Sequence, residues 1–209
     1  MTNSLTSPRT AAPLTLALLV FAFALANYTQ DMALLSLTPP PTDANPNPGP
    51  DVTPDRVFSL YLSAYTAWAA LILLIPAYVF VWFQSRYQSW LAFWAASYVA
   101  YVVHLYISAF WFFEGDFTAM TTSSRVSAFW PGMVILVWWG VDVLIGLALA
   151  TGRWVTIQRV IVHLLVFVLF VGGSAVKGET TTIQLMGWAF FGAGVGAMVV
   201  YVVNRRKAA

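Results

Sequence analysis

Three ionisable side chains, His104, Asp142 and His163, lie inside long apolar stretches of this 209-residue chain. They comprise both of its histidines and one of its eight acidic residues. An ionisable group in a membrane is costly and is by default a candidate for function. A carboxylate and an imidazole can relay protons or bind a substrate, and a neutral imidazole can also ligate a metal.

His104 belongs to a polar and aromatic stripe on the stretch from 90 to 113. At about 100° per residue, the stripe covers about 100° of one helix face. Its members are Trp90, Trp94, Ser97, Tyr101, His104, Ser108 and Trp111. The opposite face carries apolar residues that suit lipid: Ala92, Val99, Val102 and Ile107. The stripe must face the bundle interior, a cavity or a partner. Two interpretations follow: its hydroxyls are packing hydrogen bonds, or it lines a site for a ligand, a proton path or a pigment.

Asp142 and His163 are expected to meet, because a tight turn joins the two apolar stretches that carry them. Counted at about 1.5 Å per residue, Asp142 lies roughly 13 Å and His163 roughly 10 Å from the cytoplasmic end. Arg159, one turn nearer that end, competes for the same carboxylate. The sequence therefore predicts a structural Asp–His or Asp–Arg pair, or else a proton relay or substrate-binding pair.

The positions of the histidines also bear on cofactors. His104 lies roughly 22 Å deep, about 12 Å from the level of His163, which disfavours a haem held by both. Ligation of a five-coordinate haem or a chlorophyll-type pigment by one histidine stays open, as does a quinone. The absence of cysteine excludes iron–sulfur clusters, c-type haem and thiolate zinc sites. We expect no metal site built from protein ligands alone.

Composition places these residues in a membrane protein. Hydrophobic residues make up 60% of the chain and charged residues 9%, against about 25% charged residues in soluble domains. Soluble globular and disordered proteins are thereby excluded. We predict an all-α, polytopic membrane protein, a single-domain bundle of about six transmembrane helices. The predicted spans are 11–37, 58–83, 90–113, 130–150, 155–175 and 183–203.

Two segments near the N-terminus need separate interpretation. Residues 1–26 are predicted to form a retained helix, although a signal peptide cleaved after Ala26 is the alternative. Residues 38–56 hold seven of the eleven prolines and are expected to be an extended extracytoplasmic linker.

The charges orient the predicted bundle. With the N-terminus inside, seven of the ten Lys and Arg residues fall on the cytoplasmic side, which obeys the positive-inside rule. Both termini are then cytoplasmic, and we expect a bacterial inner membrane. The small basic excess reflects topology and does not indicate nucleic-acid binding.

The last apolar stretch is rich in small residues. Gly192 and Gly196 form a GxxxG pair, beside Ala189 and Ala193. Small residues at this spacing let two helices approach closely. They predict either internal packing or contact with another subunit, including a second copy of the chain.

No motif of a known catalytic site accompanies these features. The chain has no phosphate-binding GxxxxGK[ST] loop and no HExxH pattern, so the sequence argues against an enzyme. The favoured function is a non-catalytic accessory or assembly subunit of a larger membrane complex, with lipid and other membrane subunits as partners. The alternatives are a small proton-coupled transporter using Asp142 and His163, or a membrane redox protein with a His-ligated tetrapyrrole or a quinone.

Overall fold

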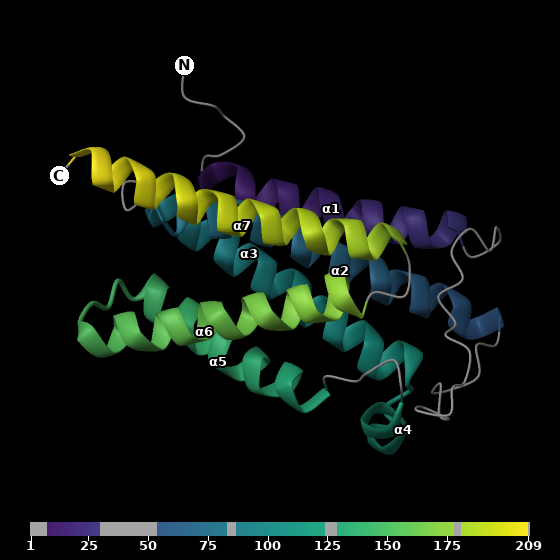
Figure 1. Cartoon of the computed structure of the whole chain (residues 1–209). Helices are drawn as coiled ribbons and strands as arrows, with labels where there is room; N and C mark the ends of the chain where they lie inside the picture. The colour runs from purple at the N-terminus through teal and green to yellow at the C-terminus, as the bar shows by residue number, and fades with distance from the viewer. Residues whose placement is uncertain (1–7, 30–53, 83–86, 124–128, 178–180, 209) are drawn as a thin grey trace.

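The computed structural model describes residues 8–29, 54–82, 87–123, 129–177 and 181–208. These residues form an all-α protein with no strand among them, as the sequence predicts (Figure 1). The helices are α1 (Pro8–Thr29), α2 (Pro54–Phe80), α3 (Tyr87–Tyr106), α4 (Phe117–Thr122), α5 (Phe129–Leu147), α6 (Arg153–Val171) and α7 (Thr181–Ala208). Two π-helical segments, η3 (Ile107–Phe112) and η5 (Gly172–Val176), continue α3 and α6.

Six helical stretches of the described chain are long and apolar enough to cross a membrane: Arg9–Thr29, Arg56–Phe80, Tyr87–Phe112, Phe129–Leu147, Arg153–Val176 and Thr181–Asn204. The protein is therefore an integral membrane protein with the predicted number of spans. The predicted extension of the first span over 30–37 lies outside the described residues, as does nearly all of the proline-rich segment 38–56.

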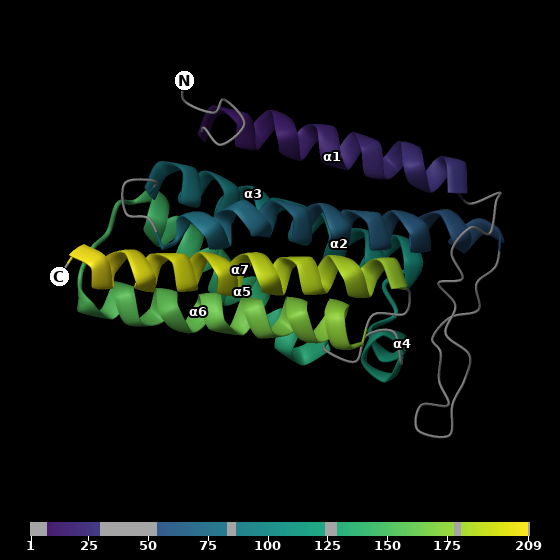
Figure 2. The same cartoon turned by 45° about the horizontal axis from the view of Figure 1, so that its top comes forward.

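Helices α2 and α3 form the centre of the bundle. Helix α1 packs on one side of them, with α5 and α6 on the other (Figure 2). Helix α7 lies along α2 and α6. Helix α1 begins and helix α7 ends at the same end of the bundle (Figure 1). We call this end, where α5 also turns into α6, the terminal end, and the opposite end, with η3 and α4, the distal end.

The short helix α4 was not expected from the sequence. Asp116 caps its N-terminus by accepting a hydrogen bond from the Ala119 backbone N–H at 2.9 Å. Just before it, Glu114 forms an ion pair with Arg56 of α2, with 2.7 Å between Oε2 and Nη2. Six residues are too few to give a clear apolar period, which explains why the sequence did not reveal this helix.

The π-helical segment η3 changes which residues of the third span face inward. The predicted stripe is buried at Trp90, Trp94 and Tyr101. Beyond Tyr106 the prediction is wrong, because Trp111 is 46% exposed and Ile107 is buried. A π-helical hydrogen bond, such as Phe113 N–H to Ser108 O at 3.0 Å, takes an extra residue into the turn. Trp111 lies inside this turn and is rotated from its α-helical position. Ile107 precedes the turn and is buried because α1 and α2 cover it, in a cluster that includes Ala26 and Tyr65.

Candidate functional site

Asp142 lies at the centre of a polar cluster in the terminal half of the bundle. Its side chain is fully buried. Oδ2 accepts a hydrogen bond from Trp94 Nε1 at 2.9 Å. Oδ1 accepts from the Gln158 amide and from Arg159 Nε, the latter at 3.3 Å. A buried charge is tolerated when it is paired and hydrogen-bonded, and both conditions hold for this carboxylate.

His163 lies beside this cluster with both ring nitrogens engaged. Nε2 is 3.0 Å from Trp90 Nε1, and an indole N–H only donates, so Nε2 accepts. Nδ1 is 2.8 Å from the Arg159 carbonyl oxygen, which only accepts, so Nδ1 carries the proton. The ring is thus the neutral Nδ1–H tautomer. Neither nitrogen is left for a ligand.

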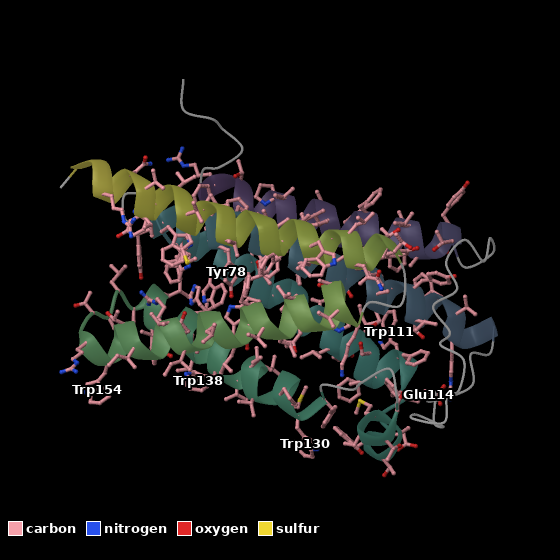
Figure 3. The ribbon with its side chains drawn as sticks, in the orientation of Figure 1. Tyr78, Trp111, Glu114, Trp130, Trp138 and Trp154 are labelled. Atoms are coloured by element: carbon pink, nitrogen blue, oxygen red, sulfur yellow. The ribbon has the colours of Figure 1, made fainter. Side chains whose placement is uncertain are left out.

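Aromatic rings enclose the Asp142–His163 region. Trp94 stacks on His163 with ring centroids 3.9 Å apart and planes 12° from parallel. The Arg159 guanidinium lies 4.6 Å from the Trp90 ring centroid, a cation–π contact. Tyr78 points into the bundle from α2 (Figure 3) and donates to the His163 carbonyl oxygen at 2.5 Å. In the same view the side chains of Trp130 and Trp154 point away from the bundle.

The predicted contact between Asp142 and His163 is only partly right. The two residues share a cluster, but the described residues show no hydrogen bond between them. Trp94 stands between them instead, bonded to the carboxylate and stacked on the imidazole. The predicted Asp142–Arg159 pair is present. Nδ1 of His163 is bonded back to its own helix, four residues earlier, which leaves that nitrogen unavailable to the carboxylate.

Sequence reasoning missed Gln158, which ties α6 to α5. Its amide donates to Asp142, and its Oε1 accepts from Trp138 Nε1 at 3.0 Å. A polar side chain next to Arg159 in an apolar span was the available signal. Two buried donors of the described region have no partner, Trp139 Nε1 and Arg159 Nη2. Each unpartnered donor carries a desolvation cost.

A second, smaller cluster surrounds His104 in the distal half. Its Nδ1 is 2.8 Å from the Ser63 carbonyl oxygen and 3.3 Å from Ser63 Oγ. The Ser108 hydroxyl donates to the His104 carbonyl oxygen at 2.8 Å and lies 2.6 Å from Ser63 Oγ. Tyr101 is adjacent, with its ring centroid 6.1 Å from that of His104, but its hydroxyl donates to Gly132 O at 3.3 Å. Ser63 was not anticipated from the sequence.

His104 differs from His163 at Nε2. Nδ1 must carry the proton, because the Ser63 carbonyl oxygen only accepts. Nε2 then presents a lone pair, and no described residue donates a hydrogen bond to it. The side chain is partly exposed. The predicted residues Tyr101, His104 and Ser108 are thus neighbours, separate from the cluster of Asp142, Arg159 and His163.

The small residues of α7 divide between two faces. Gly187 and Gly194 face inward, and a Cβ on Gly194 would lie 3.0 Å from the Phe167 ring. Gly192 and Gly196 are exposed, and a Cβ on either would meet nothing within 4 Å. Ala189 is also exposed and Ala193 partly so. Within the described residues, internal packing, one interpretation of the GxxxG pair, is therefore wrong.

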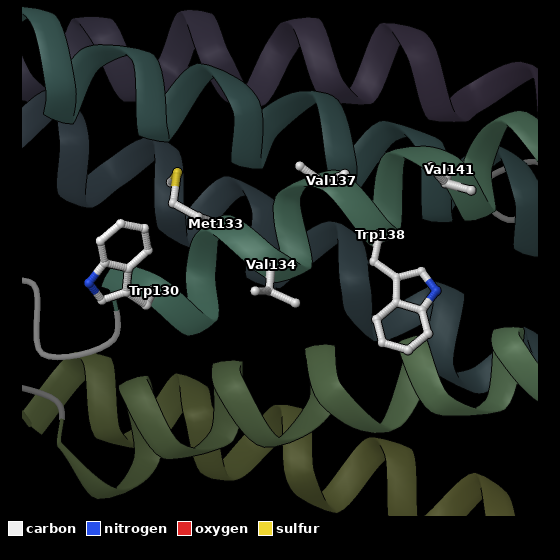
Figure 4. A pocket seen from close by; sticks show the side chains of 6 residues that line it. All are labelled: Trp130, Met133, Val134, Val137, Trp138 and Val141. Atoms are coloured by element: carbon white, nitrogen blue, oxygen red, sulfur yellow. The ribbon is translucent and has the colours of Figure 1, made fainter.

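A shallow apolar groove runs along the outer face of α5 (Figure 4). It is lined by Trp130, Met133, Val134, Val137, Trp138 and Val141. All six residues come from one helix, and none places an ionisable group in the groove. Such a surface suits contact with lipid chains.

Comparisons of this chain with protein-family models, with curated proteins and with solved structures found no match. The described residues also contain no group of three or more His, Cys, Asp or Glu side chains that could hold a metal ion. Functional inference therefore starts from the two polar clusters and from the outer face of α7.

Proposed function

We propose that this protein is a non-catalytic accessory or assembly subunit of a larger membrane complex. The observation that carries the proposal is the outward-facing row of Ala189, Gly192 and Gly196, which we call the α7 ridge. The ridge is a bare strip of backbone on the outside of the bundle, of the kind that a transmembrane helix of a partner can approach closely.

Without a partner helix, no contact among the described residues explains why positions 192 and 196 are glycine. Each glycine in a helix interior costs about 1 kcal/mol relative to alanine. Gly194 and Gly187 offset that cost through close internal packing, but Gly192 and Gly196 gain no such packing from the described residues. Between helices in lipid, the compensating term is van der Waals contact with a neighbouring helix.

The polar cluster around Asp142 supports a structural rather than a chemical role for this chain. Both carboxylate oxygens have donors, both nitrogens of His163 are engaged, and Asp142 is fully buried. A proton-coupled carrier would need one of these groups to exchange protons with water or substrate. The cluster instead fastens α3, α5 and α6 together.

The same proposal includes the identity of the membrane and the orientation of the protein in it. Arg9, Arg153 and Arg206 lie at the terminal end of the bundle, near the start of α1, the start of α6 and the end of α7. The positive-inside rule then favours cytoplasmic termini in a bacterial inner membrane. Accessibility of a cysteine introduced near either terminus, tested in intact cells against permeabilised cells, measures this orientation.

Native mass spectrometry tests the subunit role. The protein is extracted from its own membrane in a mild detergent, as the wild type and as Gly192→Leu and Gly196→Leu. We expect the wild type to form a complex with other polypeptides. Neither leucine variant should form it, because a leucine on the α7 ridge holds the partner helix away. The matched control is Val202→Leu, an exposed position on the flank of α7, which should leave the complex intact.

Two outcomes would overturn the proposal. One is a wild-type protein that is monomeric throughout, or associated only with copies of itself. The other is a complex that survives both leucine substitutions on the ridge.

A further inference from the structure

Three aromatic rings lead from the terminal end of α3 to the buried cluster around Asp142. Tyr87, Trp90 and Trp94 follow one another along the helix, with ring centroids 5.2 Å apart in the first pair and 6.4 Å apart in the second. Tyr87 is partly exposed, whereas Trp90 and Trp94 are buried. At about 1.5 Å per residue, Trp94 lies about 10 Å along α3 from Tyr87. We call these three residues the ring row.

Rings at this spacing can pass an electron from one to the next. The rate of electron transfer falls steeply with the distance between donor and acceptor, so two short steps are faster than one long step. In a chain without cysteine, indole and phenol are the side chains that give up one electron most readily. An oxidant at Tyr87 can therefore draw an electron from Trp94, although Trp94 has no exposed surface.

The carboxylate of Asp142 distinguishes Trp94 from Trp90. Trp94 Nε1 donates to Asp142 Oδ2 at 2.9 Å, so this indole is bonded directly to a negative charge. Loss of an electron leaves a positive charge on the ring, and an adjacent anion stabilises that charge more strongly where water is excluded. Trp90 has the opposite neighbour, because the Arg159 guanidinium lies 4.6 Å from its ring centroid. A positive charge is therefore more favourable on Trp94 than on Trp90.

Trp139 provides an internal comparison with Trp94. The two rings are neighbours, with centroids 4.7 Å apart, and both are fully buried. Among the described residues, the Trp139 N–H has no hydrogen-bond partner, so no anion is bonded to that indole. Trp94 is consequently the indole on which a positive charge settles.

We propose that Trp94 is a redox-active residue that donates one electron, through Trp90 and Tyr87, to an oxidised metal complex at the terminal end of the bundle. The metal is reduced by one electron, and Trp94 becomes an indole radical cation. This site does not depend on the accessory role proposed for the chain, since it uses none of the residues of the α7 ridge.

The step moves one electron and no atom. The proton stays on Trp94 Nε1, because Gln158 and Arg159 already donate to Asp142 Oδ1 and favour the carboxylate. No covalent bond forms or breaks, and no proton has to leave the membrane interior. The cluster therefore still fastens α3, α5 and α6 together after the electron has left.

Flash oxidation of the full-length protein in detergent tests the proposal. Because the chain has no cysteine, Gln88→Cys, at an exposed position next to Tyr87, carries a single ruthenium tris(bipyridine) label. A light flash with a cobalt(III) quencher converts the label to ruthenium(III), the oxidised metal complex of the test. We expect ruthenium(II) to reappear as the absorption of an indole radical cation forms. In frozen samples, a water-soluble nickel complex should not relax the electron spin of this radical, because Trp94 is buried.

Three variants of the labelled protein locate the radical. Trp94→Phe should abolish the radical cation, because a phenyl ring is far harder to oxidise than an indole. Trp139→Phe is the matched control and should keep the signal, since Trp139 is equally buried and its N–H bonds to no described residue. Asp142→Asn keeps an acceptor for the Trp94 N–H but removes the negative charge, so the yield of the radical should fall. Circular dichroism checks the fold of each variant.

Four results would overturn the proposal. They are the absence of an indole radical in the labelled protein, a neutral indolyl radical, a radical that the nickel complex relaxes, and an equal signal in Trp94→Phe. The first three need no substitution in the ring row or the cluster, so a variant that does not fold still leaves a decisive test. Failure of the accessory role would appear in native mass spectrometry and would leave these optical signals unchanged.

Discussion

The two histidines of the membrane interior make the same kind of hydrogen bond at Nδ1 and differ at Nε2. Each donates Nδ1–H to a backbone carbonyl oxygen 2.8 Å away, at Ser63 for His104 and at Arg159 for His163. At Nε2, His163 accepts from Trp90, whereas His104 has no donor among the described residues. His163 is buried between rings, and His104 is partly exposed. The same side chain thus completes a closed network in one place and presents a free lone pair in the other.

The difference follows from what surrounds each ring. The terminal half holds a buried carboxylate, which accepts from side chains of α3 and α6, and one of these donors, Trp94, also covers His163. Among the described residues, the distal half holds no buried acid, and the serines Ser63 and Ser108 lie beside His104. The donors that the carboxylate requires pack closely around His163, and no such group acts on His104.

The largest effect is expected from removing the cation of the closed region. Arg159→Leu leaves the Asp142 carboxylate buried without its ion pair, and we expect a loss of about 3–5 kcal/mol in the free energy of unfolding. The double variant Asp142→Leu/Arg159→Leu should be clearly more stable than the single one. Denaturant unfolding in detergent measures both. Full stability of Arg159→Leu would mean that the terminal cluster does not hold the bundle together.

A smaller loss is expected from the indole that links the carboxylate to the imidazole. Trp94→Phe retains an aromatic ring over His163 but removes the N–H that donates to Asp142. An unsatisfied buried acceptor costs about 1–3 kcal/mol, and that is the expected loss on unfolding in detergent. The control is Trp138→Phe, whose indole is only partly buried and donates to the neutral Gln158. Equal losses for the two variants would contradict the special role of Trp94.

The substitution Trp90→Phe tests the hydrogen bond at Nε2 of His163. It keeps an aromatic ring at position 90 but removes the N–H that donates to the buried imidazole. An unsatisfied buried acceptor costs about 1–3 kcal/mol, and unfolding in detergent should show a loss in that range. Unchanged stability would mean that this hydrogen bond does not help to hold α3 and α6 together.

The smallest effects compare the two faces of α7. Gly196→Ala should stabilise the isolated protein by up to about 1 kcal/mol, since its Cβ meets nothing within 4 Å. Gly194→Ala should give no gain or a loss, because its Cβ would lie 3.0 Å from the Phe167 ring. Thermal unfolding of the isolated variants measures the difference. A gain at Gly194 equal to that at Gly196 would contradict the assigned faces.

Much of the fold could be predicted, because apolar length and composition alone define membrane-spanning helices. The inward face of α3 was also predictable as far as Tyr101, since an α-helical period holds that far. It failed at Trp111, because the sequence does not show where a hydrogen bond changes from i→i+4 to i→i+5. It failed at Ile107, because the sequence does not show that α1 and α2 cover that position.

The sequence identified most residues of the candidate sites one by one, but not which of them contact each other. Rarity in an apolar span identified Asp142, His163 and His104. That Trp94 stands between the first two, and that Ser63 bonds the third, depends on how α2, α3, α5 and α6 rotate against one another. Tyr78 gave no signal, because a tyrosine in an aromatic-rich span is unremarkable until its partner is known.

The most direct test of the difference between the two histidines is ¹⁵N NMR of histidine-labelled protein in lipid nanodiscs, as the wild type and as Trp90→Phe. With two histidines in the chain, His163→Gln assigns the signals. In the wild type both rings should be neutral Nδ1–H tautomers. Because Trp90 donates to Nε2 of His163, Trp90→Phe should shift that signal and leave the Nε2 signal of His104 in place. A shift at His104, or no shift at either ring, would contradict the contrast between the two histidines.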